Sequence, residues 1–191
     1  MTTNLEKGKN PAELLDSPVE GALTYINVET LEKNGNSYAM KSKNSVICQD
    51  GDILMLMDGA RSGVVFRGCK GVVGSTFSII KMDSILKHII FEYLKACKEP
   101  IVFNNTGSAI PHANKEFINR MTVFMPSDSD LIGRFNQVYQ GLFDQKRILE
   151  LKNTGLKEMK NMLLPRLISG KLSVENLDIQ FPPGMVGEYS V

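Results

Sequence analysis

The feature that most constrains the fold is a long heptad pattern near the C-terminus. From about residue 128 to 164, apolar residues recur at alternating intervals of four and three, which places them along one side of an α-helix. The seam contains the apolar residues Leu131, Phe135, Val138, Leu142, Leu149, Leu156, Met159 and Leu163. At ~1.5 Å per residue such a helix is roughly 50 Å long. That exceeds what the core of the preceding domain needs, so the pattern predicts a helix that packs against a partner.

Two polar residues, Gln145 and Lys152, interrupt the seam near its middle. The segment SDSD before the helix supplies N-caps and acidic first-turn residues. Pro165 is expected to cut or kink the helix, and Gly170 to stop a short terminal turn. The remaining residues, 178–191, are expected to form a flexible tail.

Short strand-like runs and glycine turns fill the first half of the chain. Strands are expected within 24–31, 45–49, 52–57, 63–66 and 72–80, with Asp50-Gly51 as a hairpin turn between the second and third runs. Residues 84–98 have helical spacing behind Asp83 as N-cap, and 101–126 combine a glycine loop, a short helix or turn and a strand at 121–125. We therefore predict an α+β chain. A flexible lead-in covers 1–22, a small, mostly antiparallel β-rich domain covers 23–127, and the long helix with its terminal turn covers 128–177.

Composition excludes several classes of protein. The chain is 42% hydrophobic and 23% charged, which is typical of a soluble globular domain, and it contains no apolar run long enough to span a membrane. No signal peptide is expected at the start, so the cytoplasm is the expected location. The three cysteines, Cys48, Cys69 and Cys97, match no zinc spacing and are expected to be buried or half-buried thiols. No metal site is predicted.

We find no catalytic motif. The sequence lacks G-x-x-x-x-G-K-[ST], G-x-G-x-x-G and G-x-S-x-G, and it lacks the Asn/Asp-Pro-Pro-aromatic loop of an adenine methyltransferase. Asp50, Asp52 and Asp58 flank a strand, but turn-forming aspartates explain them better than paired catalytic carboxylates. An enzyme is therefore not predicted, and no cofactor is expected in this chain.

The loops favour a binding role. The net charge is only +1, but two mildly basic blocks follow an acidic start, which permits a polyanionic partner. Loops at 59–63, 67–71 and 104–115 mix basic residues with Ser, Thr, Asn and His, the groups that bind phosphates and base edges. The candidate DNA-binding residues are Lys41, Lys43, Arg61, Ser62, Arg67, Lys70, Thr106, Ser108, His112 and Lys115. The alternative is that these loops are ordinary surface turns.

Four stretches together resemble one half of the specificity subunit of a type I restriction–modification system. They are GDILMLMDGARSGVVF, GVVGSTFSIIK, TGSAIPHANKEFINRMTVFMP and LKEMKNMLLPRLISGKL, and the resemblance covers roughly residues 23–177. The resemblance implies a target-recognition domain that reads half of a split DNA site. It also implies a long helix that pairs as an antiparallel coiled coil and spaces two such domains. Methyltransferase subunits, which carry the S-adenosylmethionine, would dock on this non-catalytic subunit.

The sequence departs from the family pattern in ways that leave alternatives open. Members usually carry two recognition domains and two helices, whereas this chain has one of each, so a homodimer through the helix is the simplest expectation. The helix begins with PSDSDLI in place of a Glu-Gln motif, and the family's Trp-containing first strand is missing. The alternative function is a truncated specificity chain that acts only as a coiled-coil assembly module.

Overall fold

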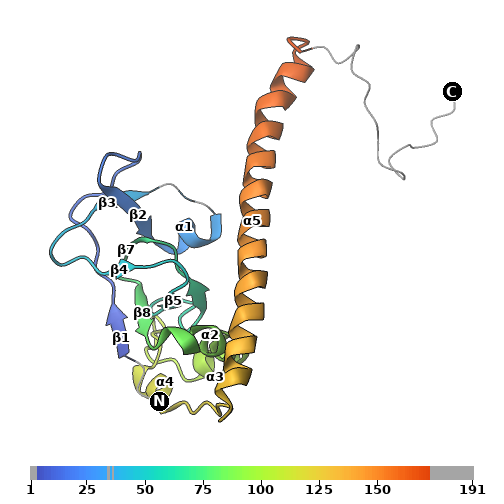
Figure 1. The fold of residues 1–191 in the computed structure, drawn as a ribbon. Helices are drawn as coiled ribbons and strands as arrows, with labels where there is room; N and C mark the ends of the chain where they lie inside the picture. The colour runs from blue at the N-terminus through green and yellow to red at the C-terminus, as the bar shows by residue number, and fades with distance from the viewer. Residues whose placement is uncertain (1–3, 34, 36, 173–191) are drawn as a thin grey trace, which may run out of the picture. The chain divides into compact units, whose positions relative to one another are not determined.

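A computed structural model of the chain describes residues 4–33, 35 and 37–172 (Figure 1). The chain divides into two compact units, the first ending at Tyr139 and the second beginning at Gln140. The first unit contains both sheets, the short helices and the first turns of the long helix. The tail expected over 178–191 lies outside the described residues.

The first sheet is antiparallel and supplies most of the core. Its strands lie in the order β1 (Asn4–Lys7), β8 (Phe77–Lys81), β5 (Ile53–Leu56) and β6 (Val65–Arg67). All four residues of β5 are buried, since one apolar cluster covers Ile53 and Met55 and another covers Leu54 and Leu56. A continuous apolar run is what a strand buried on both faces requires.

The second sheet is smaller and mixed. Its order is β3 (Tyr38–Met40), β2 (Ala22–Ile26), β7 (Gly71–Val73) and β4 (Ile47–Cys48), with β2 and β7 parallel and the other pairs antiparallel. Helix α1 (Val28–Lys33) follows β2, and Asn27 caps it by accepting a hydrogen bond from the Thr30 N–H at 2.8 Å.

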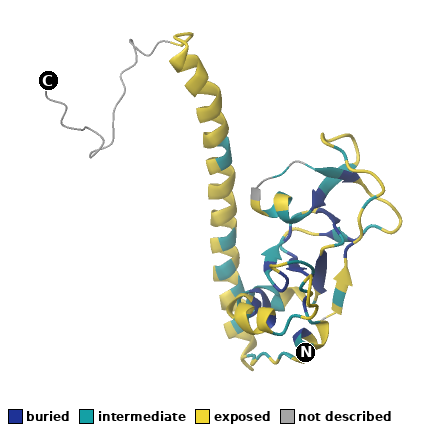
Figure 2. Cartoon of the chain, turned by 180° about the vertical axis from the view of Figure 1, so that it is seen from behind, coloured by how far each residue is buried: buried dark blue, intermediate teal, exposed yellow. Residues whose placement is uncertain are grey.

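Short helices cover one face of the first sheet. The 3₁₀ turn η1 (Ser84–Leu86) leads into α2 (Lys87–Ala96), followed by α3 (Lys98–Phe103) and α4 (Lys115–Arg120). Helix α2 inserts Ile90, Phe91 and Leu94 into the cluster that also contains Ile53 and Ile80. Figure 2 shows that buried residues gather in the sheets and these short helices.

The long helix α5 (Ser129–Ile168) confirms the predicted helix, and the α+β class is confirmed with it. The helix runs through Pro165, so the expected break there is wrong. Pro165 lies in the last turn, and its carbonyl still accepts the Ser169 N–H at 3.0 Å. Gly170, at φ +68°, ends the helix as expected.

Three expectations about strands are wrong. Asp50-Gly51 does not join a hairpin, because β4 and β5 belong to different sheets. The single strand expected over 72–80 is two strands in different sheets, separated by a turn in which the Phe77 N–H donates to the Gly74 carbonyl at 3.1 Å. Residues 121–125 form no strand, since they pair with no sheet.

The lead-in also differs from the expectation of a flexible loop over 1–22. Its described part contains β1, which pairs with β8 in a register that sets Leu5 opposite Ile80. The pairing continues past the strand, because the Gly8 N–H donates to the Phe77 carbonyl at 2.9 Å. The compact unit therefore reaches from the lead-in to Tyr139, beyond both limits of the predicted 23–127 domain.

Candidate nucleic-acid interface

Two of the loops singled out in the sequence are joined into one surface. The Gly59 N–H donates to the Pro111 carbonyl at 2.9 Å, and the Ala113 N–H donates to the Met57 carbonyl at 2.8 Å. The Asn105 side-chain amide also donates to the Ser62 hydroxyl at 2.7 Å. We call residues 57–63 and 104–115 the joined loops.

Polar contacts to one carboxylate add to the joined loops. His112 Nδ1 lies 2.8 Å from the Asp58 carboxylate, and Lys7 Nζ lies 3.5 Å from the same carboxylate. Lys7 was not among the predicted residues. Only the pairing of β1 with β8 brings it here, so no local signal in the sequence indicates it.

The 104–115 loop folds back on itself and exposes its tip. Thr106 and His112 exchange backbone hydrogen bonds of 2.9 and 2.7 Å. Gly107 makes this turn possible, because its φ is +91° and a Cβ there would lie 2.4 Å from the Ile110 carbonyl oxygen. The candidates Thr106, Ser108, His112 and Lys115 are all exposed on this one loop.

Two candidate residues in the other joined loop, 57–63, bond to other groups of the protein. Arg61 forms an ion pair with Glu32, and one of its hydrogen bonds to that carboxylate is 2.8 Å long. This hydrogen bond and the attraction of the carboxylate raise the pKa of the Arg61 guanidinium above its ordinary value. Ser62 is fully buried, and its hydroxyl accepts the Asn105 amide, so its place is in the support of the loop.

The candidate lysines Lys41 and Lys70 lie away from the joined loops. Strands β5 and β6 separate the two regions. At one end of the pair Met55 lies opposite Val65, next to the joined loops, and at the other end Ile53 lies opposite Arg67, where the 67–71 loop begins. Lys41 directly follows β3, and Lys70 directly precedes β7. Because β3 is antiparallel and β7 parallel to β2, both lysines lie at the end of the second sheet where β2 begins.

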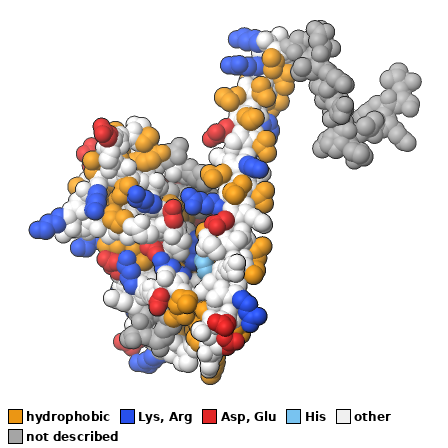
Figure 3. All heavy atoms as spheres, viewed as in Figure 1, with side chains coloured by type: hydrophobic (Ala, Val, Ile, Leu, Met, Phe, Trp, Pro, Cys, Tyr) orange, Lys and Arg blue, Asp and Glu red, His pale blue; other side chains and the backbone are white. Residues whose placement is uncertain are grey.

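Exposed lysines thus lie at this end of the second sheet as well as beside the joined loops. Lys41, Lys43 and Lys70 are all exposed, and the Lys70 N–H is held by the Asp50 carboxylate at 2.8 Å. On the face seen in Figure 3, Lys and Arg side chains alternate with Asp and Glu over the sheet unit.

Arg67, one of the candidate DNA-binding residues, is engaged in contacts within the protein. Its guanidinium carbon lies 4.1 Å from the centre of the Phe91 ring and 5.5 Å from that of Tyr139. The same group donates to the Gly51 carbonyl at 3.0 Å and lies 3.1 Å from His88 Nδ1. Arg67 therefore joins β6 to α2 and to the first turns of α5.

Further contacts at this junction hold the start of α5. Tyr139 stacks on His88 with ring centres 4.5 Å apart and donates its hydroxyl to Glu92 at 2.6 Å. Burial and this hydrogen bond raise the pKa of Tyr139. Burial alone would raise the pKa of Glu92, but hydrogen bonds from Tyr139 and Lys95 outweigh it and hold that pKa below its ordinary value. Asn136 adds a hydrogen bond to the Ile85 carbonyl at 2.7 Å. We call this set of contacts the arginine junction.

The predicted seam of α5 is uncovered. Within the described residues no side chain of α5 is buried, and Leu142, Leu149 and Leu156 are 62%, 60% and 60% exposed. The other seam residues, Leu131, Phe135, Val138, Met159 and Leu163, are exposed as well. The stripe of hydrophobic side chains along α5 is visible in Figure 3.

The structure offers little to catalysis in the part of the chain that it describes. No group of three or more His, Cys, Asp or Glu side chains gathers there to hold a metal ion. Asp50, Asp52 and Asp58 each bind a different basic or backbone group and form no carboxylate pair. Cys48 is buried and the other two cysteines are half-buried, as predicted, and burial raises the pKa of the Cys48 thiol. No helix of the described residues has the length and apolar character of a membrane span.

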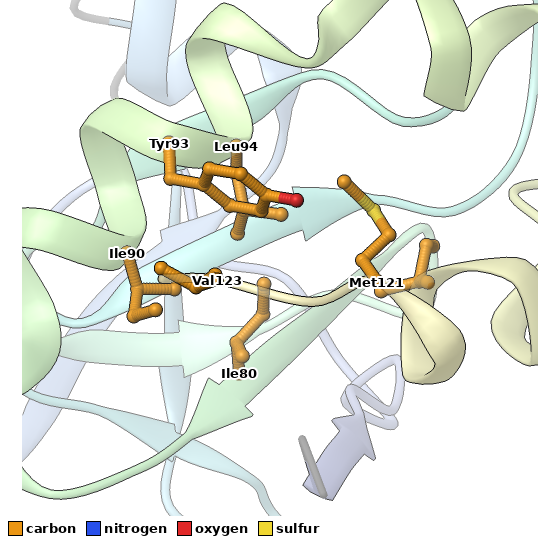
Figure 4. A pocket seen from close by; sticks show the side chains of 7 residues that line it. Ile80, Ile90, Tyr93, Leu94, Met121 and Val123 are labelled. Atoms are coloured by element: carbon orange, nitrogen blue, oxygen red, sulfur yellow. The ribbon is translucent and has the colours of Figure 1, made fainter. Parts of the chain in front are cut away.

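One small pocket lies between β8, α2, α4 and the segment after α4 (Figure 4). Its lining is apolar and consists of Ile80, Ile90, Tyr93, Leu94, Ile118, Met121 and Val123. The Tyr93 hydroxyl already donates to the Thr122 carbonyl at 2.9 Å. This small apolar pocket is best explained as imperfect packing between these elements.

Comparisons with known proteins show what the chain is similar to. No protein-family model matches it. In an alignment of 157 residues, the chain is 31% identical to the type I restriction enzyme MjaVIII specificity subunit of Methanocaldococcus jannaschii, and the alignment covers 74% of this chain and 37% of that relative.

Two solved structures share the fold. The crystal structure of a type I restriction–modification system S subunit from M. genitalium matches with a TM-score of 0.58 at 17% identity, over 84% of this chain and 41% of the other. A structure from work on complex assembly and conformational transition of the type I R-M system matches with a TM-score of 0.50 at 12% identity, over 86% and 43%. The chain thus spans less than half the length of each of these three proteins.

Proposed function

Because the chain belongs to the family of type I restriction–modification specificity subunits, we propose that it reads one half of a bipartite DNA site. The observation that supports this most is the 31% identity to a specificity subunit in an alignment that covers 74% of the chain. Specificity subunits are non-catalytic. Methyl transfer and cleavage, with the S-adenosylmethionine that methylation needs, therefore belong to partner subunits that dock on this chain. Because the assembly would act on cellular DNA, we expect it in the cytoplasm.

We assign base readout to the joined loops. The segment 104–115 carries exposed hydroxyl, imidazole and ammonium groups, and hydrogen bonds to the other joined loop fix its geometry. Such side chains read base edges by hydrogen bonds, and a loop geometry that is fixed in advance lowers the entropic cost of forming them. The exposed lysines Lys41, Lys43, Lys70 and Lys115 would contact phosphates and set affinity without sequence preference.

A second copy of the chain would supply the other half-site. Each chain has one recognition unit and one long helix with an uncovered apolar seam. Two copies paired through α5 would form a symmetric reader of a palindromic bipartite site.

The alternative, an assembly module without DNA recognition, is favoured by one observation. Arg61 and Arg67, two of the strongest basic candidates, are engaged with Glu32 and with the arginine junction. Such a chain would still pair through α5 and bind a methyltransferase.

Binding-site selection from randomised duplexes separates the two functions. The full chain, mixed with the methyltransferase of its own host, is expected to enrich a bipartite motif. Ser108→Ala should relax the motif at single positions, whereas Lys70→Ala should weaken binding to all sequences alike. Loss of one phosphate contact should make the slope of log K against log salt shallower by about 0.9. If the methyltransferase binds but no motif is enriched, the assembly function is correct and the recognition function is not.

A further inference from the structure

We infer that Arg61 reads a guanine in the major groove and that Glu32 is the residue that positions it for this contact. The inference rests on the proposed function and names one base contact within it. Three features of the first compact unit hold the Arg61 guanidinium: the turn that carries the residue, the Glu32 carboxylate and the Phe66 ring.

The backbone on both sides of Arg61 is fixed. The Ser62 N–H donates to the Gly59 carbonyl at 2.9 Å, and the Val64 N–H donates to the Arg61 carbonyl at 3.2 Å, so Arg61 lies within two successive tight turns. Ser62 is fully buried and bonded to Asn105. The Arg61 side chain, which is 49% exposed, therefore leaves the joined loops from a fixed point.

The Glu32 carboxylate fixes the orientation of the guanidinium. Glu32 lies in α1, which follows a strand of the second sheet, whereas the 57–63 loop joins β5 to β6 of the first sheet. One carboxylate oxygen accepts from Arg61 Nη1 at 2.8 Å, and the other accepts from Nη2. This end-on arrangement uses one N–H of each terminal nitrogen.

A second pair of donors remains on the Arg61 guanidinium. The Nε–H and the further N–H of one terminal nitrogen point the same way along the side of the planar group. No acceptor among the described residues bonds to this pair. The centre of the Phe66 ring lies 5.8 Å from the guanidinium carbon and supports one face of the group. The second pair of donors is therefore oriented before DNA binds.

A guanine edge matches this second pair of donors. In the major groove guanine presents two neighbouring acceptors, O6 and N7, and a bidentate arginine is their commonest partner. Adenine presents N7 beside an amino group, whose hydrogens would face an arginine N–H, and neither pyrimidine offers two acceptors there. Donors that are oriented in advance also lose less entropy on binding.

The charge of Glu32 favours a base over a phosphate. Paired arginine donors bind phosphates as well. A phosphate on the second pair would lie close to the Glu32 carboxylate, however, and the two negative charges would repel. A guanine edge is neutral, so it does not meet this repulsion between full charges. The ion pair of Arg61 with Glu32, which by itself favours the assembly function, is thus equally explained by an arginine that reads a base.

Duplexes that contain 7-deazaguanine, which lacks only the N7 acceptor, test the contact without altering the protein. Selection by the full chain with the methyltransferase of its own host first gives the bipartite motif, and each guanine in the motif is then replaced in turn. Wild type should bind several-fold more weakly at the guanine that Arg61 reads. Arg61→Ala should bind the normal duplex about 5- to 150-fold more weakly. It should show no base preference and no effect of 7-deazaguanine at that position alone.

Glu32→Gln separates positioning from simple support of the loop. It preserves the size of the side chain and removes its charge, so the preference for guanine should fall several-fold while binding to unrelated duplexes becomes stronger. Loss of mere support would weaken binding to every duplex alike. Added to Arg61→Ala, the same change should not alter base preference. Glu29→Gln removes the same charge from an exposed position of α1 and should leave the guanine preference intact. Urea unfolding shows whether each variant is folded.

The outcomes that overturn the inference are distinct. Equal weakening on all sequences by Arg61→Ala, with a slope of log K against log salt shallower by about 0.9, would make Arg61 a phosphate contact. Unchanged binding by Arg61→Ala would make the ion pair an ordinary surface contact. In both cases the wild-type motif, and with it the proposed function, would stand. A wild type that enriches no motif would overturn the proposed function and this inference together.

Discussion

Replacing Arg67 by alanine decides between a DNA contact and a structural role. From its position in the 67–71 loop, the sequence makes Arg67 a candidate for binding DNA. In the structure the guanidinium is stacked 4.1 Å from the centre of Phe91 and hydrogen-bonded to the Gly51 carbonyl at 3.0 Å. We therefore expect Arg67→Ala to act mainly on the stability of the fold.

The magnitude follows from the contacts that would be lost. A cation–π contact of a partly desolvated arginine contributes about 1 kcal/mol, and a hydrogen bond from a charged donor contributes about 1.5–3 kcal/mol. The variant should lose about 3 kcal/mol of unfolding free energy. With a urea dependence of about 2 kcal/mol per molar, the unfolding midpoint should fall by about 1.5 M.

The assay is urea unfolding followed by circular dichroism, with Lys70→Ala as the control. Lys70 lies three residues away and is exposed, so its replacement should change stability by less than about 0.5 kcal/mol. Arg67→Lys should recover only part of the loss, because an ammonium group does not stack as a planar guanidinium does. An unchanged midpoint for Arg67→Ala together with weaker DNA binding would refute the structural role.

Two further predictions concern the arginine junction and a loop glycine. Tyr139→Phe removes the hydrogen bond to Glu92 and should cost about 1–2 kcal/mol at neutral pH. Folding lowers the pKa of Glu92. The stabilisation that this carboxylate gives is therefore present when the pH is above its pKa in the unfolded chain, and it is lost as the pH falls through its pKa in the folded chain. The difference between variant and wild type in urea midpoint should therefore shrink below about pH 4, and a constant difference would argue against this bond. Gly63→Ala should cost at least about 2 kcal/mol, since φ is +94° and the added Cβ would lie 2.6 Å from the Ile101 side chain. Gly59→Ala, at φ +98° in open space, should cost only about 1 kcal/mol in the same urea unfolding experiments, and equal losses would contradict the assigned clash.

Much of the architecture could be predicted because its signal is local. Burial on both faces makes β5 a continuous apolar run, and α2 shows helical spacing behind Asp83. The membership of strands in sheets could not be predicted in this way. Whether residues 72–80 form one strand or two depends on where β2 and β5 lie, and 121–125 has the composition of a strand but no partner.

Part of the candidate site could also be predicted from local sequence, and part could not. The loop 104–115 was found because its polar composition and glycine are visible in the sequence. The roles of Arg61 and Arg67 were not visible, because Glu32, Phe91 and Tyr139 are distant in the chain and approach only in the folded state.

By itself, the sequence determined the long helix, its apolar seam and the α+β class, since each depends on the periodicity of neighbouring residues. Only the tertiary structure decided which basic side chains face solvent and which join the helix to the domain. The physical reason is that a side chain's partners are set by pairing across the sheets and by packing between elements. Those contacts join residues that are far apart in the sequence, and no local pattern indicates that they will meet.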